Sequence, residues 1–254
     1  MGGLRGNIKK MNALVVGYGS IGRRHVLNLA KLDCVDRIIV YTNVKADLDK
    51  SSARKVTFLD ASALTLNDAC KFLKANFAII ANQTHKHIDT AITLAQKGVD
   101  LFIEKPISHN LEKINILEEI ARNKKTKIFV AYNLRFLPAL RYIKDLLAQE
   151  VIGKLYFAKI EVGQYLPCWR KNINYQDSYS SKTEYGGGVA LDLSHEVDYM
   201  RYLFGDPHLW KTIKSKAADL ETDYNLYKSQ LIIFQAIVHT PMFCDSLRLQ
   251  MNCD

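Results

Sequence analysis

The stretch that decides the fold lies near the start of the chain: Met11-Asn12-Ala13-Leu14-Val15-Val16-Gly17-Tyr18-Gly19-Ser20-Ile21-Gly22-Arg23-Arg24-His25. The apolar run from Ala13 to Val16 predicts a buried strand. Three glycines follow it at G-x-G-x-x-G spacing, and apolar residues then recur at helical spacing as far as Ala30. The stretch therefore predicts a strand, a glycine turn and a helix, in that order.

Each glycine of this turn has a separate structural role in a phosphate-binding site. Gly17 allows the tight turn, Gly19 lets the backbone approach a pyrophosphate, and Gly22 lets the helix pack on the strand. The helix start, at Ser20 and Ile21, offers unpaired backbone N–H groups and a partial positive charge to the anion. We predict a dinucleotide-binding turn, and the alternative is a glycine-rich turn in some other α/β domain.

Length and composition limit the class of protein. A chain of 254 residues suggests two domains, at about 150 residues each. No run reaches the roughly 18 apolar residues of a membrane span, and the first ten residues lack the apolar core of a signal peptide. The five cysteines are scattered and none forms C-x-x-C, so we expect no zinc site, no disulfide framework and a cytoplasmic location.

The net charge of +9 raises the question of nucleic-acid binding. The lysines and arginines are spread along the chain, and no basic tract is longer than Lys124-Lys125 with its neighbour Lys127. We therefore expect no nucleic-acid partner. A basic surface of this kind attracts anionic small molecules such as dinucleotides and sugar nucleotides.

The end of the second predicted strand, Arg37 to Tyr41, bears on the choice between NAD and NADP. NAD enzymes commonly carry Asp or Glu here, about 20 residues after the glycines, for the ribose hydroxyls. This chain has Thr42 and Asn43, with Lys45 just beyond. A carboxylate would repel the 2′-phosphate of NADP, whereas these side chains tolerate it. The pattern therefore favours NADP slightly, and NAD remains the alternative. Lys45 is alternatively an exposed loop lysine.

Strands and helices alternate through the first half of the chain, which indicates a parallel, doubly wound sheet. We predict a Rossmann domain over residues 1–132. Its expected strands are 13–16, 37–41, 56–59, 77–81, 99–103 and 127–132, and its expected helices include 66–74, 88–95 and 111–122.

Polar residues follow the fourth, fifth and sixth of these strands. Ligand loops of a parallel sheet lie at the carboxyl ends of its strands, so we expect cofactor contacts from them. His85 and His87 are close enough to suggest a metal, but no third ligand is evident, and we expect none. The loop after the fourth strand, with Asn82, Gln83 and His87, is the first of these that we expect to contact the cofactor.

The pattern changes after Asn133, and we predict an incomplete α+β domain over residues 133–254. A helix is expected at 139–149, a longer strand at 154–162 and a helix at 189–204. The polar, aromatic stretch at 165–185 is too long for a tight connection and predicts a functional loop or lid.

Three motifs stand together in order: Gly17-x-Gly19-x-x-Gly22, Glu104-Lys105-Pro106 and Gly186-Gly187-Gly188-x-x-x-Asp192-x-x-His195-x-x-Asp198. Their combination resembles the Gfo/Idh/MocA family of NAD(P)-dependent oxidoreductases, named for glucose–fructose oxidoreductase and inositol dehydrogenase. The resemblance covers roughly residues 11–207, and Asn133-x-Arg135-Phe136 and His87 match the family's usual pattern too. It implies cofactor contacts from Glu104, Lys105 and Asn133. It implies a second domain with an open, mostly antiparallel sheet that carries the dimer interface.

The resemblance also implies roles for individual residues. Lys105 lies beside the nicotinamide, with Asp192 and His195 across the substrate, and Glu104 anchors Lys105 or meets the nicotinamide ribose. The chemistry agrees, because hydride transfer at an alcohol needs a group that moves the hydroxyl proton, and histidine titrates in the useful range. Asp192 stands three residues before His195 on one expected helix, so the two share a face. A histidine on such a helix is alternatively structural.

Two smaller expectations concern the same motifs. Lys105 can polarise the substrate oxygen and favour its alkoxide form. A cis peptide is expected before Pro106, where it would mark a tight turn.

The chain departs from the family after Pro207, where the second domain is shorter than usual. Residues 210–216 and 230–238 are expected to supply two strands, and the sheet is expected to be truncated. A missing part of the sheet would leave apolar faces uncovered. We expect a homo-oligomer, a dimer or tetramer, if the second domain is sufficiently complete.

Two functions follow as hypotheses. The first is an NAD(P)-dependent oxidoreductase that moves a hydride between the nicotinamide and a hydroxyl-bearing carbon of a sugar, cyclitol or nucleotide sugar, as in surface-polysaccharide metabolism. The second is a catalytically impaired remnant that binds the dinucleotide without turnover. A cofactor-sensing regulator is a third, disfavoured because no DNA-binding helix pair is evident.

Overall fold

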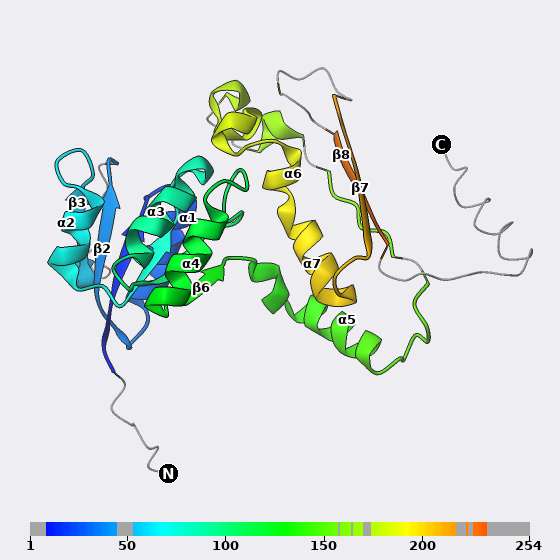
Figure 1. Cartoon of the computed structure of the whole chain (residues 1–254), viewed down its shortest axis with the longest axis horizontal. Helices are drawn as coiled ribbons and strands as arrows, with labels where there is room; N and C mark the ends of the chain where they lie inside the picture. The colour runs from blue at the N-terminus through cyan, green and yellow to red at the C-terminus, as the bar shows by residue number, and fades with distance from the viewer. Residues whose placement is uncertain are drawn as a thin grey trace, which may run out of the picture.

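The computed structural model describes residues 9–44, 53–156, 158–163, 165–169, 174–216, 222 and 226–232. Two parts follow one another along the chain (Figure 1). The first is an α/β part with a central parallel sheet, and the second is built of helices, short turns and a two-stranded sheet.

The first part contains a six-stranded parallel sheet in the order β3-β2-β1-β4-β5-β6. Val16 at the end of β1 is paired with Tyr41 of β2 on one side and Ile80 of β4 on the other. The order of strands reverses at β1, and this switch point is where open α/β sheets bind ligands. The strands are β1 Met11–Val16, β2 Val35–Thr42, β3 Val56–Asp60, β4 Phe77–Ile80, β5 Asp100–Ile103 and β6 Ile128–Val130.

Helices cover both faces of this sheet, which confirms the predicted doubly wound fold. Alternate residues of β1 enter different cores: Val15 packs in a cluster with Val26 of α1, and Leu14 in a cluster with Leu94 of α3. Burial of each such side chain contributes about 1.5–3 kcal/mol. The helices are α1 Ser20–Ala30, α2 Leu66–Leu73, α3 His87–Ala95 and α4 Ile114–Lys124.

The second part begins at Asn133, shortly after β6, and is less regular. Strands β7 and β8 pair antiparallel from Leu209 opposite Ile232 to Ser215 opposite Leu226. The strand expected at 230–238 begins earlier than predicted, and its positions beyond 232 lie outside the described residues. The elements are α5 Pro138–Ala148, α6 Val189–Asp192, α7 Ser194–Phe204, β7 Leu209–Ser215 and β8 Leu226–Ile232.

The strand predicted at 154–162 is wrong for the residues that the structure describes there, which are irregular. An isolated extended segment is not stable without a partner, and none of the strands in the described part pairs with it. Residues 165–185 are a loop, as predicted, because those that the structure describes form only short 3₁₀ turns. The functional role of this loop stays a prediction. In the described residues no helix is both long and apolar enough for a membrane span.

Candidate active site

The predicted strand, glycine turn and helix form at the switch point. Gly17 has a φ of +96°, and a Cβ there would lie 2.7 Å from the carbonyl oxygen of Ala81. A Cβ at Gly22 would lie 2.2 Å from the carbonyl oxygen of Gly17, so the helix can approach the turn only without a side chain. Gly19 differs, because a Cβ there would meet nothing within 4 Å.

The start of α1 has the features of an anion site. Gly19 is its N-cap and supplies no side-chain hydrogen bond, and the first turn carries no acidic residue. The first-turn N–H groups, around the exposed Ser20 and the half-buried Ile21, are therefore uncapped by a side chain. Together with the open space at Gly19, these residues fit the pyrophosphate of a dinucleotide.

The end of β2 presents one exposed candidate for the ribose. Thr42 is buried, and its hydroxyl oxygen accepts the backbone N–H of Val44 at 3.1 Å. Asn43 is exposed, so it is the residue of this pair whose side chain can reach a cofactor. Lys45 lies outside the described residues.

The loops after β4 and β5 are tied together by His87. Its Nδ1 lies 2.9 Å from the carbonyl oxygen of Pro106, and its Nε2 lies 3.1 Å from that of Asn82. The side chain is only 2% exposed, and burial lowers its pKa below the ordinary value. The buried ring therefore holds the two ligand loops in place, and the expected cofactor contact of His87 stays a prediction.

The remaining expected residues of these loops lie closer to the surface. Gln83 is exposed, and Asn82 is half-buried, with its amide donating to the Thr90 hydroxyl at 3.0 Å. The Asn82 Oδ1 is buried with no hydrogen-bond partner in the described part of the chain. Asn133, after β6, is exposed. All three therefore follow strands of the parallel sheet, as expected, but the structure does not test their contact with a cofactor.

Lys105 follows β5 and reaches across to the second part. Its Nζ donates to the backbone carbonyl oxygen of Asp192 at 2.5 Å. Burial lowers the pKa of Lys105 from its ordinary value, although the negative charges of Asp192, Glu104 and Glu196 oppose that shift. The expected cis peptide between Lys105 and Pro106 is present.

The carbonyl that Lys105 contacts is available because the predicted helix at 189–204 is broken. The helix α6 ends at Asp192, Leu193 has φ −101° and ψ 31°, and α7 begins at Ser194. The N–H of Glu196 donates to the Leu193 carbonyl instead of the Asp192 carbonyl. The expectation that Asp192 and His195 share one helix face is therefore wrong, since they belong to different helices.

His195 lies in the first turn of α7. Its ring packs edge-on against the ring of Tyr132, with centroids 5.6 Å apart, and its Nδ1 is buried with no partner in the described residues. Burial and the nearby positive charge of Lys105 lower the pKa of His195, against the opposing charges of Asp198 and Glu104. The imidazole is consequently neutral at pH 7 and able to accept a proton.

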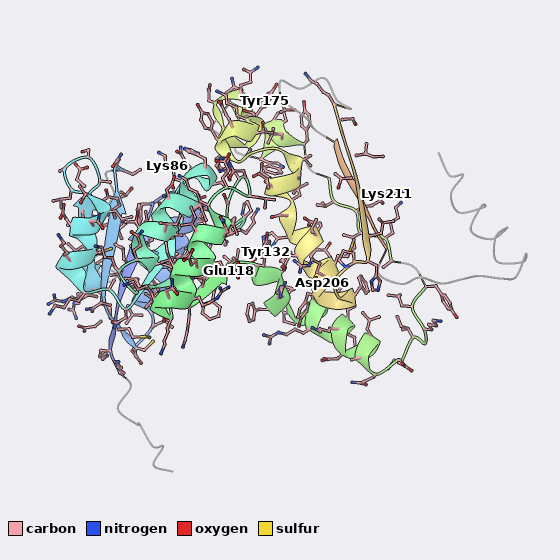
Figure 2. All side chains as sticks on the ribbon, in the orientation of Figure 1. Lys86, Glu118, Tyr132, Tyr175, Asp206 and Lys211 are labelled. Carbon is pink, nitrogen blue, oxygen red and sulfur yellow. The ribbon has the colours of Figure 1, made fainter. Side chains whose placement is uncertain are left out.

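Further contacts join the loop after β6 to α7. Arg135 donates from Nε and Nη2 to the two carboxylate oxygens of Asp198 at 2.8 and 2.6 Å. The Tyr132 hydroxyl donates to the Ser194 hydroxyl at 3.5 Å, and Figure 2 labels Tyr132 where the chain leaves the sheet. The sequence motifs contained Arg135 and Asp198, but spacing alone did not pair them.

The sequence also missed one acidic group near Lys105, Glu196, whereas it had predicted Glu104. Glu196 directly follows His195, and burial raises its pKa against the opposing charge of Lys105. Glu104 bonds to His25 of α1 at 2.6 Å. Within the described ranges no group of three His, Cys, Asp or Glu side chains is placed to hold a metal ion.

This fold and site define a class. A parallel sheet whose strand order reverses beside a glycine turn that opens a helix is typical of Rossmann-type dinucleotide-binding proteins.

Comparison with known proteins identifies the family. A sequence model described as "Oxidoreductase family, NAD-binding Rossmann fold" matches residues 11–132, and the GFO/IDH/MocA C-terminal domain matches residues 140–233. The chain belongs to the GFO/IDH/MocA oxidoreductase family.

Individual relatives are distant. The rhizopine catabolism protein MocA of Rhizobium meliloti is 25% identical over 80% of this chain and 60% of its own length. An inositol 2-dehydrogenase of Serratia proteamaculans is 21% identical over 96% of this chain and 68% of its own. A structure of Lactobacillus casei scyllo-inositol dehydrogenase, with bound NAD(H) and scyllo-inositol, has a TM-score of 0.60 at 19% identity, over 81% of this chain and 60% of that one. The chain spans little more than half the length of the curated relatives that it first matches.

Proposed function

We propose that this chain acts as an NAD(P)-dependent oxidoreductase on a hydroxyl-bearing carbon of a sugar, cyclitol or nucleotide sugar. The observation that carries the proposal is the placement of Lys105, which follows β5 at the ligand edge of the sheet and bonds to the Asp192 carbonyl, with His195 in the next helical turn. The name of the inositol 2-dehydrogenase relative supports the substrate class.

The glycine turn and Asn43 would hold the dinucleotide. The start of α1 at Gly19 receives the pyrophosphate, and Asn43 faces the adenosine ribose. When bound, the nicotinamide supplies a carbon that accepts or donates a hydride. Asn43 carries no charge to repel a 2′-phosphate, so we propose that NADP is accepted as well as NAD.

The chain's own residues supply the proton chemistry. Lys105, as an ammonium, stabilises the alkoxide that develops on the substrate oxygen. His195 is neutral at pH 7 because its pKa is lowered, and its Nδ1 is buried, so Nε2 takes the hydroxyl proton during oxidation. Arg135 holds Asp198, and thereby α7, in the orientation that this transfer requires.

A specific observation favours the second candidate, a protein that binds dinucleotide without turnover. The second part contributes no buried hydrophobic side chain in the described residues, so the groups opposite the cofactor are held largely by polar contacts. A site with loose support loses rate before it loses cofactor affinity.

The variant Lys105→Ala separates the two candidates. We expect turnover of myo-inositol, scyllo-inositol, glucose or glucose 6-phosphate with NAD or NADP to fall about 10²–10⁴-fold. The affinity for NADH, measured by nicotinamide fluorescence, is expected to stay within about threefold. The control is Lys124→Ala, at an exposed position of α4, which should match the parent chain.

The outcomes are distinct. A folded parent chain that binds NADH and turns over none of the probes favours the binding protein. Undiminished turnover in Lys105→Ala contradicts the role of the lysine. Light scattering on the same sample tests our further expectation of a homo-oligomer.

A further inference from the structure

His25 has no role in the chemistry above, yet it makes one of the closest contacts of the site. It lies in α1, three residues after Gly22, and its Nε2 is 2.6 Å from Oε1 of Glu104. The two side chains are 17% and 14% exposed, so the contact is largely shielded from water. A bond of this kind is stronger than an exposed one, because little solvent screens it.

Glu104 also contacts the backbone of Lys105. Its second carboxylate oxygen, Oε2, accepts the backbone N–H of Lys105 at 3.3 Å. The backbone N–H of Glu104 itself donates to the Ile80 carbonyl at 2.9 Å, which fixes its main chain against β4. The carboxylate therefore connects a side chain of the cofactor helix to the peptide that carries Lys105.

The His25 ring is held in turn by the sheet. It packs edge-on against Phe102 of β5, with centroids 5.6 Å apart and planes at 74°. The imidazole thus has a fixed orientation, and its Nε2 must carry a proton for it to donate to the carboxylate. His25 of α1 thereby contacts both Phe102 in β5 and Glu104, the residue that directly follows β5.

We propose that His25 is a positioning residue for Lys105, acting through Glu104 to align the lysine with the turn that holds the dinucleotide. The consequence for turnover rests on the proposed function, whereas the linkage itself does not. Without the imidazole donor, the half-buried Glu104 carboxylate loses a partner and turns to the nearest cation, the Lys105 ammonium.

That movement of Glu104 favours the charged form of the Lys105 amine. The charged groups facing Lys105 are Asp192, Glu104 and Glu196, and His195 lies nearby. A closer Glu104 carboxylate stabilises the ammonium, and loosening of the loop admits water, which stabilises it too. Both effects raise the pH at which the amine becomes reactive.

The experiment measures that pH directly. Full-length protein is acetylated with acetic anhydride over a range of pH, and the rate at Lys105 is read by peptide mass spectrometry. The variants are His25→Phe, which keeps a ring against Phe102 but has no donor, and His25→Gln, whose amide can donate. The matched control is His208→Ala, at an exposed histidine far along the chain.

We expect His25→Phe to raise the midpoint of Lys105 acetylation by about half to one pH unit, which is about three- to tenfold lower reactivity below the midpoint. His25→Gln and His208→Ala should keep the parent midpoint. An unchanged midpoint in folded His25→Phe overturns the proposal, as does an equal shift in the control. If His25→Phe does not fold, His25→Leu serves in the same comparison.

The test stays separate from that of the function. Acetylation needs no substrate, so the linkage is decided even if no probe sugar is turned over. A shifted midpoint with an unchanged kcat would keep the linkage and contradict the role of Lys105 in the reaction. A merely structural role of His25 would lower the melting temperature in all His25 variants without moving the Lys105 midpoint.

Discussion

The two parts of the molecule are held together by different forces. In the described residues, every buried hydrophobic side chain lies between Ala13 and Ala131, and nearly all of them form two clusters on the faces of the parallel sheet. The buried side chains of the second part are polar, namely Ser178, Ser180, Ser181 and Asp198, and α5 has no buried residue. The first part therefore has a hydrophobic core of its own, whereas the buried side chains described in the second part are polar.

Specific contacts join the described residues of the two parts. Lys105 bonds to the Asp192 carbonyl, and the rings of His85 and Tyr185 lie with their centroids 5.3 Å apart. Gly186 approaches Thr84 so closely that a Cβ there would lie 2.6 Å from the threonine Cβ. Hydrogen bonds and close packing of this kind fix geometry more than they add stability. We infer that the sheet half is the stable platform and that the other half aligns the reacting groups.

The largest loss of stability is expected from a substitution in the glycine turn of the sheet half. Gly22→Val forces a side chain onto the Gly17 carbonyl, where even a Cβ would lie at 2.2 Å. Because that neighbour is backbone, we expect a loss of about 3 kcal/mol or more in unfolding free energy, together with loss of NADH binding. Chemical denaturation and nicotinamide fluorescence measure the two losses.

The control for this change is Gly19→Ala. Its Cβ meets nothing within 4 Å, so folding should be unaffected, whereas the added methyl group stands where the pyrophosphate is proposed to lie. A Gly22→Val protein as stable as the parent would contradict the account of the turn.

A smaller loss is expected from His87→Leu. The substitution leaves the buried carbonyls of Pro106 and Asn82 without the ring that now contacts them. We expect about 2–4 kcal/mol of destabilisation, measured by urea unfolding at pH 7.5.

The pH dependence of stability provides a second test of His87. Its folded pKa is lowered, so the unfolded chain binds a proton more readily, and stability is lost as the pH falls below about 6.5. His87→Leu should flatten that part of the stability curve. An unchanged slope in the variant would assign the pH dependence to other groups.

The ion pair that joins the start of the second part to α7 is tested by Arg135→Met. Asp198 is only 7% exposed and would be left without its guanidinium partner, while the arginine side chain is 42% exposed. Because solvent screens part of the ion pair, we expect the stability of the second part to fall by about 1–3 kcal/mol, with no loss of stability in the sheet half. Limited proteolysis should cut within residues 138–204 faster, with unchanged protection of the sheet.

The matched control is Arg122→Met on α4. Its bond to Glu118 joins side chains that are 73% and 68% exposed, so its loss should cost no more than about 0.5 kcal/mol. Equal effects of the two arginine variants would mean that Asp198 does not hold the second part.

The smallest expected effect is the change in the rate of substrate oxidation between pH 7 and pH 6.5. The lowered pKa of His195 places the acid limb of kcat below pH 6.5, so the rate between pH 7 and 6.5 should change by less than about threefold. His195→Gln should be slow at every pH and lack that limb. A limb centred above pH 7 would contradict the neutral imidazole.

The sequence predicted the platform well because its signals are local. Strand, glycine turn and helix stand together within 20 residues, and both faces of β1 are apolar, as a central parallel strand requires. The edge residues Glu104 and Lys105 were also found, because parallel strands bring their carboxyl ends to one side.

The second part was predicted less well because its geometry depends on distant partners. The periodicity of 189–204 is continuous and contains no Gly or Pro after Gly188, so nothing in it marks the break at Leu193. Residues 154–162 have strand-like composition but no partner in the described sheets. The contact of His25 with Glu104 joins residues 79 apart in the chain, and periodicity carries no information at that distance.

The measurement that tests the central claim most directly is a nicotinamide fluorescence titration with NADH and NADPH. It is made on the full chain and on a segment comprising residues 1–132. If the sheet half is a self-sufficient dinucleotide platform, both proteins bind a reduced cofactor with affinities within about threefold of each other. A folded full chain that binds neither cofactor, or a segment that is folded and does not bind, would contradict the account.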